Sequence, residues 1–198
     1  MITIEDNVFG EKFHSSILDY CKNEAKFKGH EVGDKVFHCD VDNIDKLQKP
    51  IIKHLETGNT KITPIFSYYR MATEELDIDW RIHCDIRIFD KKPTNACIYY
   101  ISTNDKTLNG TAIWKHRIYG RYCPEVTDEE HDRLLKEDAN SLKNWNIDFV
   151  ISAEEDRLVT YPSNAFHSKY PNKAWGKTQE DCRIIFCMFY YDRSKVFS

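Results

Sequence analysis

The chain has 198 residues, of which 41% are hydrophobic and 13% aromatic, and its formal net charge is -4 at pH 7. This length suits a single domain with a sizeable buried core, and no repeat, low-complexity tract or Pro/Gly/Ser-rich linker divides it. Acidic and basic residues are interspersed rather than grouped, which argues against nucleic acid or an anionic membrane as a partner.

The N-terminal segment MITIEDNVFG lacks the basic and apolar regions of a secretory signal, and nowhere do 18 apolar residues run together. The seven cysteines are an odd number, several lie inside apolar runs, and no Cys-x-x-Cys pair occurs. A disulfide framework or a thiolate zinc site is therefore not expected. These features predict a cytoplasmic protein with no membrane span.

The first part of the chain, residues 1–60, reads as mainly helical. Apolar residues recur at helical spacing over residues 11–27 and again over 44–55, where Pro50 interrupts the pattern. We expect these helices to support the remainder of the domain.

From residue 61 to 198 the pattern changes to short runs rich in β-branched and aromatic residues, which predict strands. These runs are ITPIFSYYR, WRIHCDIRIF, ACIYYIS, TAIWKHRIY, NIDFVIS, RLVTYP and CRIIFCMFYY. Thr127, with Glu130 three residues later, forms a capping-box signature that predicts a helical insertion near residues 127–140. The fold class is therefore mainly β (α+β), a single domain with two packed sheets and helices on one side.

The triplet HCD occurs twice, at residues 38–40 and at residues 83–85. In a strand, residues i and i+2 share one face about 6.5 Å apart, so a His-x-Asp pair can grip one metal ion. A solvated polar face gives the same alternation, so the neighbouring sequence has to distinguish the two copies.

The first copy is followed by turn-forming residues and a helical pattern, which favours a turn and a helix cap around Asp40. The second copy, His83 and Asp85, is followed by the train of predicted strands. His167 comes late in that train, after a Pro-Ser-Asn turn, and Arg183 is a lone cation opening the apolar run CRIIFCMFYY. A buried arginine is costly without an anionic partner, so Arg183 implies a carboxylate from the protein or from a ligand.

Two histidines and one carboxylate make a facial triad, which leaves positions open on Fe(II) for a co-substrate and O₂. The ordered set of His83, Asp85, His167 and Arg183 resembles the Fe(II)/2-oxoglutarate-dependent oxygenases, over roughly residues 62–191. The strand ACIYYIS and the pair Gly110-Thr111 also look like the strand and the small-residue turn that follow the first two ligands in that family.

The resemblance implies a double-stranded β-helix (jelly roll) in which His83, Asp85 and His167 hold Fe(II). It implies 2-oxoglutarate and O₂ as co-substrates, and hydroxylation of an unactivated C–H of a small molecule or a protein side chain, with release of succinate and CO₂. Because Asp85 is present, hydroxylation or dealkylation is favoured over halogenation.

In such a protein the far carboxylate of 2-oxoglutarate would pair with Arg183, whose guanidinium suits a bidentate contact. Arg183 follows His167 by sixteen residues across a polar loop, so Lys173 or Lys177 is an alternative partner. Tyr68 and Tyr69, on the strand before the triplet, are candidates to help hold 2-oxoglutarate, and core aromatics are the alternative reading.

His116 lies within a cationic run at residues 115–121, which suits either an anionic substrate or a solvated sheet edge. The rival function is a non-catalytic, cupin-like jelly-roll protein that binds a metal or a small acid with the same residues. A zinc hydrolase would need a positioned general base, and no residue is singled out for that role. The sequence names neither the prime substrate nor an oligomeric state.

Overall fold

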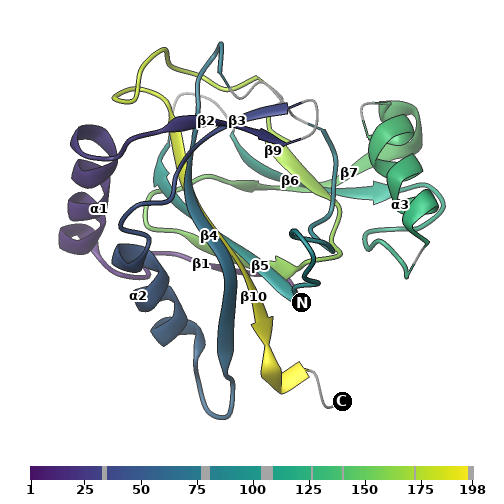
Figure 1. The fold of residues 1–198 in the computed structure, drawn as a ribbon, viewed down its shortest axis with the longest axis horizontal. Coiled ribbons are helices and arrows are strands. Elements are labelled where there is room, and N and C mark those ends of the chain that lie inside the picture. The colour runs from purple at the N-terminus through teal and green to yellow at the C-terminus, as the bar shows by residue number, and fades with distance from the viewer. Residues whose placement is uncertain are drawn as a thin grey trace.

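The computed structural model describes residues 1–32, 35–76, 81–103, 109–125, 127–139, 141–171 and 173–195. Over these ranges two antiparallel sheets face each other, and helices lie outside them (Figure 1). The helices are α1 (Glu11–Asn23), α2 (Asp45–Leu55) and α3 (Asp128–Arg133). The strands are β1 (Thr3–Glu5), β2 (Lys28–Val32), β3 (Lys35–Asp40), β4 (Ile62–Ala72), β5 (Asn95–Ser102), β6 (Gly110–His116), β7 (Trp145–Ser152), β8 (Leu158–Pro162), β9 (His167–Tyr170) and β10 (Arg183–Asp192).

The larger sheet has the strand order β1-β8-β5-β10-β4-β3-β2, and the smaller sheet has the order β7-β6-β9. Some sheet neighbours are far apart in sequence, as in β10 between β4 and β5, and every named strand pairing is antiparallel. This mainly β architecture confirms the predicted jelly roll.

Side-chain alternation along β10 divides the core into two layers. Ile184, Phe186 and Met188 pack on the face of the large sheet that α1 and α2 cover. Ile185 and Cys187 point the other way, into the space between the two sheets. Figure 1 shows α1 and α2 together on one side of the molecule and α3 on the opposite side, beside β7. The interior between the sheets is therefore where a site can be enclosed.

The two N-terminal helices form as predicted from their apolar spacing. Helix α1 buries Ile17 and Tyr20, and α2 buries Leu47 and Ile51. Pro50 does not interrupt α2, contrary to the expectation. Proline removes one backbone hydrogen bond of a helix, and the burial of its neighbours against the large sheet offsets that loss.

The structure differs from the sequence prediction in two further places. The first sixty residues contain β1, β2 and β3 as well as the helices, because β3 extends the large sheet by pairing with β4. The run WRIHCDIRIF, expected to be a strand, forms only isolated bridges at His83 and Ile88 in its described part. Its sequence alternates like that of a strand, but within residues 81–89 the structure shows no strand paired along it.

The insertion around α3 begins with the predicted capping box between Thr127 and Glu130. A π-helical turn (Leu134–Asp138) and a 3-10 turn (Leu142–Asn144) continue it toward β7. Among the helices in the described ranges, none is both long and apolar enough to cross a membrane.

Candidate metal centre

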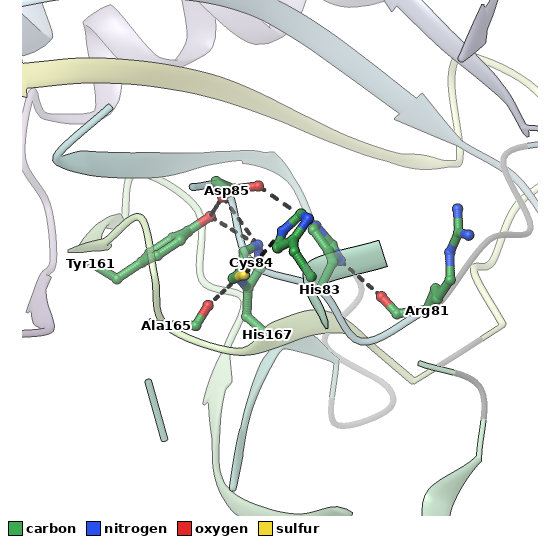
Figure 2. A network of polar contacts seen from close by, with 8 residues as sticks. Arg81, His83, Cys84, Asp85, Tyr161, Ala165 and His167 are labelled. Carbon is green, nitrogen blue, oxygen red and sulfur yellow. Dashed lines mark hydrogen bonds and ion pairs between the residues drawn. The ribbon is translucent and has the colours of Figure 1, made fainter. Parts of the chain in front are cut away.

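His83, Asp85 and His167 come together between the sheets. Each offers one ligand atom, and the three atoms lie within 4.8 Å of one another. His167 opens β9 of the small sheet, whereas His83 and Asp85 lie between β4 and β5, outside any named strand. Figure 2 shows the three side chains converging, with Asp85 between Tyr161 and the histidines.

The backbone fixes the two histidines relative to each other. The His83 N–H donates to the His167 carbonyl at 2.9 Å, and the His167 N–H donates to the His83 carbonyl at 2.8 Å. The Asp85 N–H donates to the Ser163 carbonyl at 2.6 Å. The segment of residues 83–85 is thus anchored to His167 at the start of β9 and to Ser163 before it, although it forms no regular strand.

The imidazole orientations match those of metal ligands. Nδ1 of His83 donates to the Arg81 carbonyl at 2.8 Å, and Nδ1 of His167 donates to the Ala165 carbonyl at 2.9 Å (Figure 2). These bonds assign the proton of each ring to Nδ1, so both Nε2 lone pairs are directed to the centre. His83 Nε2 lies 3.8 Å from one Asp85 oxygen and His167 Nε2 lies 3.4 Å from the other.

Burial also sets the protonation states. It lowers the pKa of His167 to about 4 and raises the pKa of Asp85 to about 6. Burial, together with the neighbouring His167, lowers the pKa of His83. At neutral pH both imidazoles are therefore neutral and Asp85 is largely ionised, the states that bind a divalent metal.

The chemistry of the three ligand atoms shows which metals could bind here. Two neutral imidazole nitrogens and one carboxylate suit Fe(II) and related divalent ions, and their arrangement leaves part of the coordination sphere for other ligands. The side chain of His83 is 38% exposed, so the centre is reachable from one side. The three residues fit a metal with open positions.

Tyr161 is a member of this centre that the sequence reading missed. Its hydroxyl lies 3.4 Å from an Asp85 oxygen and 3.3 Å from His167 Nε2. Tyr161 lies on β8, where it shares the inner face of the large sheet with Val159. Alternation along RLVTYP could have placed Tyr161 inward, but only the tertiary fold brings it to Asp85.

A small cavity between β4, β9 and β10 collects three cationic side chains, those of Arg70, Lys169 and Arg183. Arg183, predicted as the co-substrate anchor, is only 4% exposed. Arg70 lies near enough to the triad for its positive charge to act on all three residues. It favours the neutral forms of His83 and His167, and at Asp85 it opposes the burial that raises the pKa. Arg70 and Lys169 were not predicted, since their proximity depends on strand register.

The remaining sequence candidates are placed elsewhere. Tyr69 packs against Tyr20 of α1, on the opposite face of the large sheet from the triad, so it is not a candidate for holding a ligand there. Tyr68 points inward, toward Phe189 and the Asp85 side of the sheet. Lys173 and Lys177 are exposed and do not line the cationic cavity.

The cationic run at residues 115–121, which begins at the end of β6, makes salt bridges to β7. Lys115 lies 2.7 Å from Asp148, and Arg121 also pairs with this carboxylate. His116 is buried against Tyr119 and Trp145. The hypothesis of a substrate-binding role for this run is not supported by these contacts.

The first HCD triplet lies at the end of β3. The Asp40 carboxylate accepts hydrogen bonds from the Tyr20 hydroxyl at 2.7 Å and from the Asp42 N–H at 3.0 Å. Asp40 pairs in register with Tyr69, whose side chain faces the helices. This copy joins β3 to α1 and the following turn, on the other side of the sheet from the metal centre.

No protein-family model and no curated protein sequence matches the chain. Solved structures do match in fold. The non-heme alpha-ketoglutarate-dependent carbocyclase SnoK from nogalamycin biosynthesis superposes with a TM-score of 0.63 at 12% identity, covering 96% of this chain and 79% of SnoK. HygX from Streptomyces hygroscopicus, solved with nickel, 2-oxoglutarate and hygromycin B, gives a TM-score of 0.54 at 11% identity, covering 100% of this chain and 84% of HygX.

A prolyl 4-hydroxylase from Phytophthora capsici gives a TM-score of 0.54 at 12% identity, covering 98% of this chain and 59% of that protein. Identities this low carry information about the fold, not about the substrate. The protein has the double-stranded β-helix fold of the Fe(II)/2-oxoglutarate-dependent oxygenases.

Proposed function

We propose that the protein is an Fe(II)/2-oxoglutarate-dependent dioxygenase that hydroxylates an unactivated C–H of a small molecule or a protein side chain. The observation that carries the proposal is the convergence of His83, Asp85 and His167 inside a jelly roll. With 2-oxoglutarate and O₂, bound Fe(II) would supply the oxidising chemistry, with succinate and CO₂ as co-products.

The residues of the chain have distinct parts in this proposal. Nε2 of His83, Nε2 of His167 and a carboxylate oxygen of Asp85 would hold the metal, and the backbone acceptors of both Nδ1–H groups keep the rings oriented. Tyr161 supports Asp85 through its hydroxyl. The apolar residues between the sheets, such as Ile98 and Ile185, exclude water from the reacting groups.

The cationic cavity would receive the far carboxylate of 2-oxoglutarate. Arg183 is buried there and can offer two parallel N–H donors to a carboxylate. Arg70 and Lys169 line the same cavity and add to its positive potential. Tyr100 shares a 2.7 Å hydrogen bond with Thr111. Tyr100 also lies near Arg183, whose positive charge opposes the rise that burial causes in the pKa of Tyr100.

All seven cysteines are free thiols, which matches a reducing compartment such as the cytoplasm. The solved neighbours include a carbocyclase as well as a hydroxylase, so hydroxylation is the outcome that needs direct measurement.

The test is an anaerobic titration of the protein with Fe(II) and 2-oxoglutarate, followed by admission of O₂. We expect a visible charge-transfer band of the metal chelate, and then succinate release in a screen of amino acids, peptides and small metabolites. A band without succinate release would favour the non-catalytic metal-binding or acid-binding jelly-roll protein. No band and no succinate would refute the proposed function.

A further inference from the structure

A hollow of about 500 Å³ lies beside the segments that carry the proposed metal ligands. One wall comes from residues 86–93, which follow Asp85, and the other comes from residues 123–131, between β6 and β7. Ser163 and Asn164, which precede His167, also line it. Small-molecule sites in proteins usually have volumes of about 300 to 1,000 Å³, so the hollow can hold an amino acid or a short peptide.

Ser163 and Asn164 join the two walls of the hollow. The Ser163 hydroxyl donates to the Pro93 carbonyl at 2.5 Å, and the Asn164 side-chain amide donates to the Cys123 carbonyl at 3.1 Å. The Cys123 N–H in turn donates to the Asn164 carbonyl at 2.7 Å. The hollow is therefore preformed, which reduces the cost of ordering its walls when a ligand binds.

The same hydrogen-bonded segment connects the hollow to the metal centre. The Ser163 carbonyl accepts the Asp85 N–H at 2.6 Å, and Tyr161, two residues earlier, contacts the Asp85 carboxylate through its hydroxyl. Ile86, which follows Asp85 in the chain, lines the hollow. A molecule bound in the hollow therefore touches the same two segments that hold Asp85 in place.

The two walls carry opposite charges. Arg87 and Lys92 place two cations on the first wall, and Glu125 places a carboxylate on the second, where His131 adds an imidazole. A ligand with negative charge only would meet Glu125 as a like charge, and a ligand with positive charge only would meet Arg87 and Lys92. A molecule that carries both charges suits both walls.

We propose that this hollow binds the prime substrate, and that the substrate is a small zwitterion, namely a free amino acid or a short peptide with one carboxylate and one ammonium group. The carboxylate binds to Arg87 and Lys92, and the guanidinium of Arg87 suits a bidentate contact. The ammonium group binds to Glu125. The role as substrate rests on the proposed function, whereas binding of the zwitterion in the hollow does not.

The experiment measures binding by saturation-transfer difference NMR on the metal-free, full-length protein. Free amino acids and alanine-flanked tripeptides are titrated as two separate sets, which distinguishes the two sources of the zwitterion. Each compound is compared with its N-acetylated form, which lacks the ammonium group, and with its amide, which lacks the carboxylate. Loading the protein with Mn(II) then tests proximity, because the paramagnetic ion broadens the signals of a ligand bound close to it.

Four variants locate the binding site. Lys92→Ala and Glu125→Gln each remove one charge from one wall of the hollow. Lys91→Ala and Glu129→Gln are the matched controls, because both residues are exposed and lie close by in the chain but do not line the hollow.

We expect at least one compound to bind, and its N-acetylated and amide forms to bind more weakly. Lys92→Ala and Glu125→Gln should each weaken binding of that compound by about three- to tenfold, and the two controls should leave its dissociation constant unchanged. Glu125→Gln should also bind the N-acetylated form as well as the free amine, because the partner of the ammonium group is gone. Mn(II) should broaden the signals of the bound compound.

Absence of binding by every compound, or equal binding of the zwitterions and their blocked forms, would overturn the proposal. Binding that Lys92→Ala and Glu125→Gln leave unchanged would overturn its location. Binding without broadening, in protein that holds Mn(II), would overturn the role as substrate. If the protein held no Mn(II), the proposed function and the substrate role would fail together, and the metal-free titration would still decide whether the hollow binds a zwitterion.

Discussion

His83 and His167 are joined by a reciprocal pair of backbone hydrogen bonds, of 2.9 and 2.8 Å, and their rings lie 4.3 Å apart between centroids. The two residues are 84 positions apart in the chain, so this single bridge brings the first and last proposed ligands together. Because the bridge uses only main-chain atoms, substitution of a ligand side chain should remove metal binding without dismantling the site.

Arg183→Ala should weaken 2-oxoglutarate binding to the metal-loaded protein while leaving metal affinity nearly unchanged. Loss of a buried charge-assisted contact costs roughly 2 to 5 kcal/mol. Isothermal titration calorimetry of the Mn(II)-loaded protein under anaerobic conditions measures the affinity for 2-oxoglutarate. Lys177→Ala is the control, because Lys177 is exposed and lies outside the cationic cavity.

Arg183→Lys keeps a cation in the cavity and provides a second test if the alanine variant does not fold. It should bind 2-oxoglutarate with intermediate affinity, since an ammonium lacks the bidentate geometry of guanidinium. Equal affinities for wild type and Arg183→Ala would assign the anchor to Arg70 or Lys169 instead.

Tyr161→Phe should reduce metal affinity by about tenfold, because the hydroxyl that contacts Asp85 and His167 is lost while the ring remains. Mn(II) titration measures the change. Tyr190→Phe is a matched control, since Tyr190 is also a buried tyrosine but packs on the helix-covered face of the large sheet. A decrease of the same size in both variants would mean that the effect comes from packing and not from the ligand contact.

Gly110→Ala should destabilise the fold more than Gly58→Ala does. Gly110 has a φ of +149°, and an added Cβ would lie 1.9 Å from the Ile151 carbonyl oxygen. Gly58 has a φ of +58°, and no atom lies within 4 Å of its added Cβ. Gly58→Ala should therefore cost only about 1 to 2 kcal/mol of backbone strain.

Urea unfolding gives the two free energies of unfolding. In Gly110→Ala the added Cβ also clashes with backbone that the β6–β7 pairing holds in place. Gly110→Ala should therefore lose more free energy of unfolding than Gly58→Ala does. Equal midpoints for the two variants would contradict the close approach of β6 to β7 at this glycine.

Much of the architecture was predictable from local pattern. Apart from Arg183, the run CRIIFCMFYY is apolar because β10 is covered on both faces. Thr127 with Glu130 indicated the start of α3. The ordered set of His83, Asp85, His167 and Arg183, through its resemblance to a known family, pointed to the same three residues that the structure brings together.

Other features depend on pairings that no local pattern encodes. Residues 80–89 alternate like a strand, yet what holds His83 is a single bridge to a distant residue. The same limit applies to Tyr69, which faces the helices, and to Arg70, which faces the site. Adjacent residues on β4 point to opposite sides, and only the register with β10 shows which side holds the metal centre.

The most direct test of the account compares the two HCD triplets by Fe(II) titration under anaerobic conditions. Asp85→Ala removes a proposed ligand, whereas Asp40→Ala removes a contact to Tyr20 on the opposite face of the sheet, at a stability cost of about 1 to 3 kcal/mol. Circular dichroism checks that both variants are folded. If Asp40→Ala does not fold, Asp40→Asn is used in its place.

We predict that Asp85→Ala loses tight Fe(II) binding and 2-oxoglutarate turnover, and that the Asp40 variant keeps both. Retention of Fe(II) by Asp85→Ala, with loss of Fe(II) by the folded Asp40 variant, would contradict the account and place the metal at the N-terminal triplet.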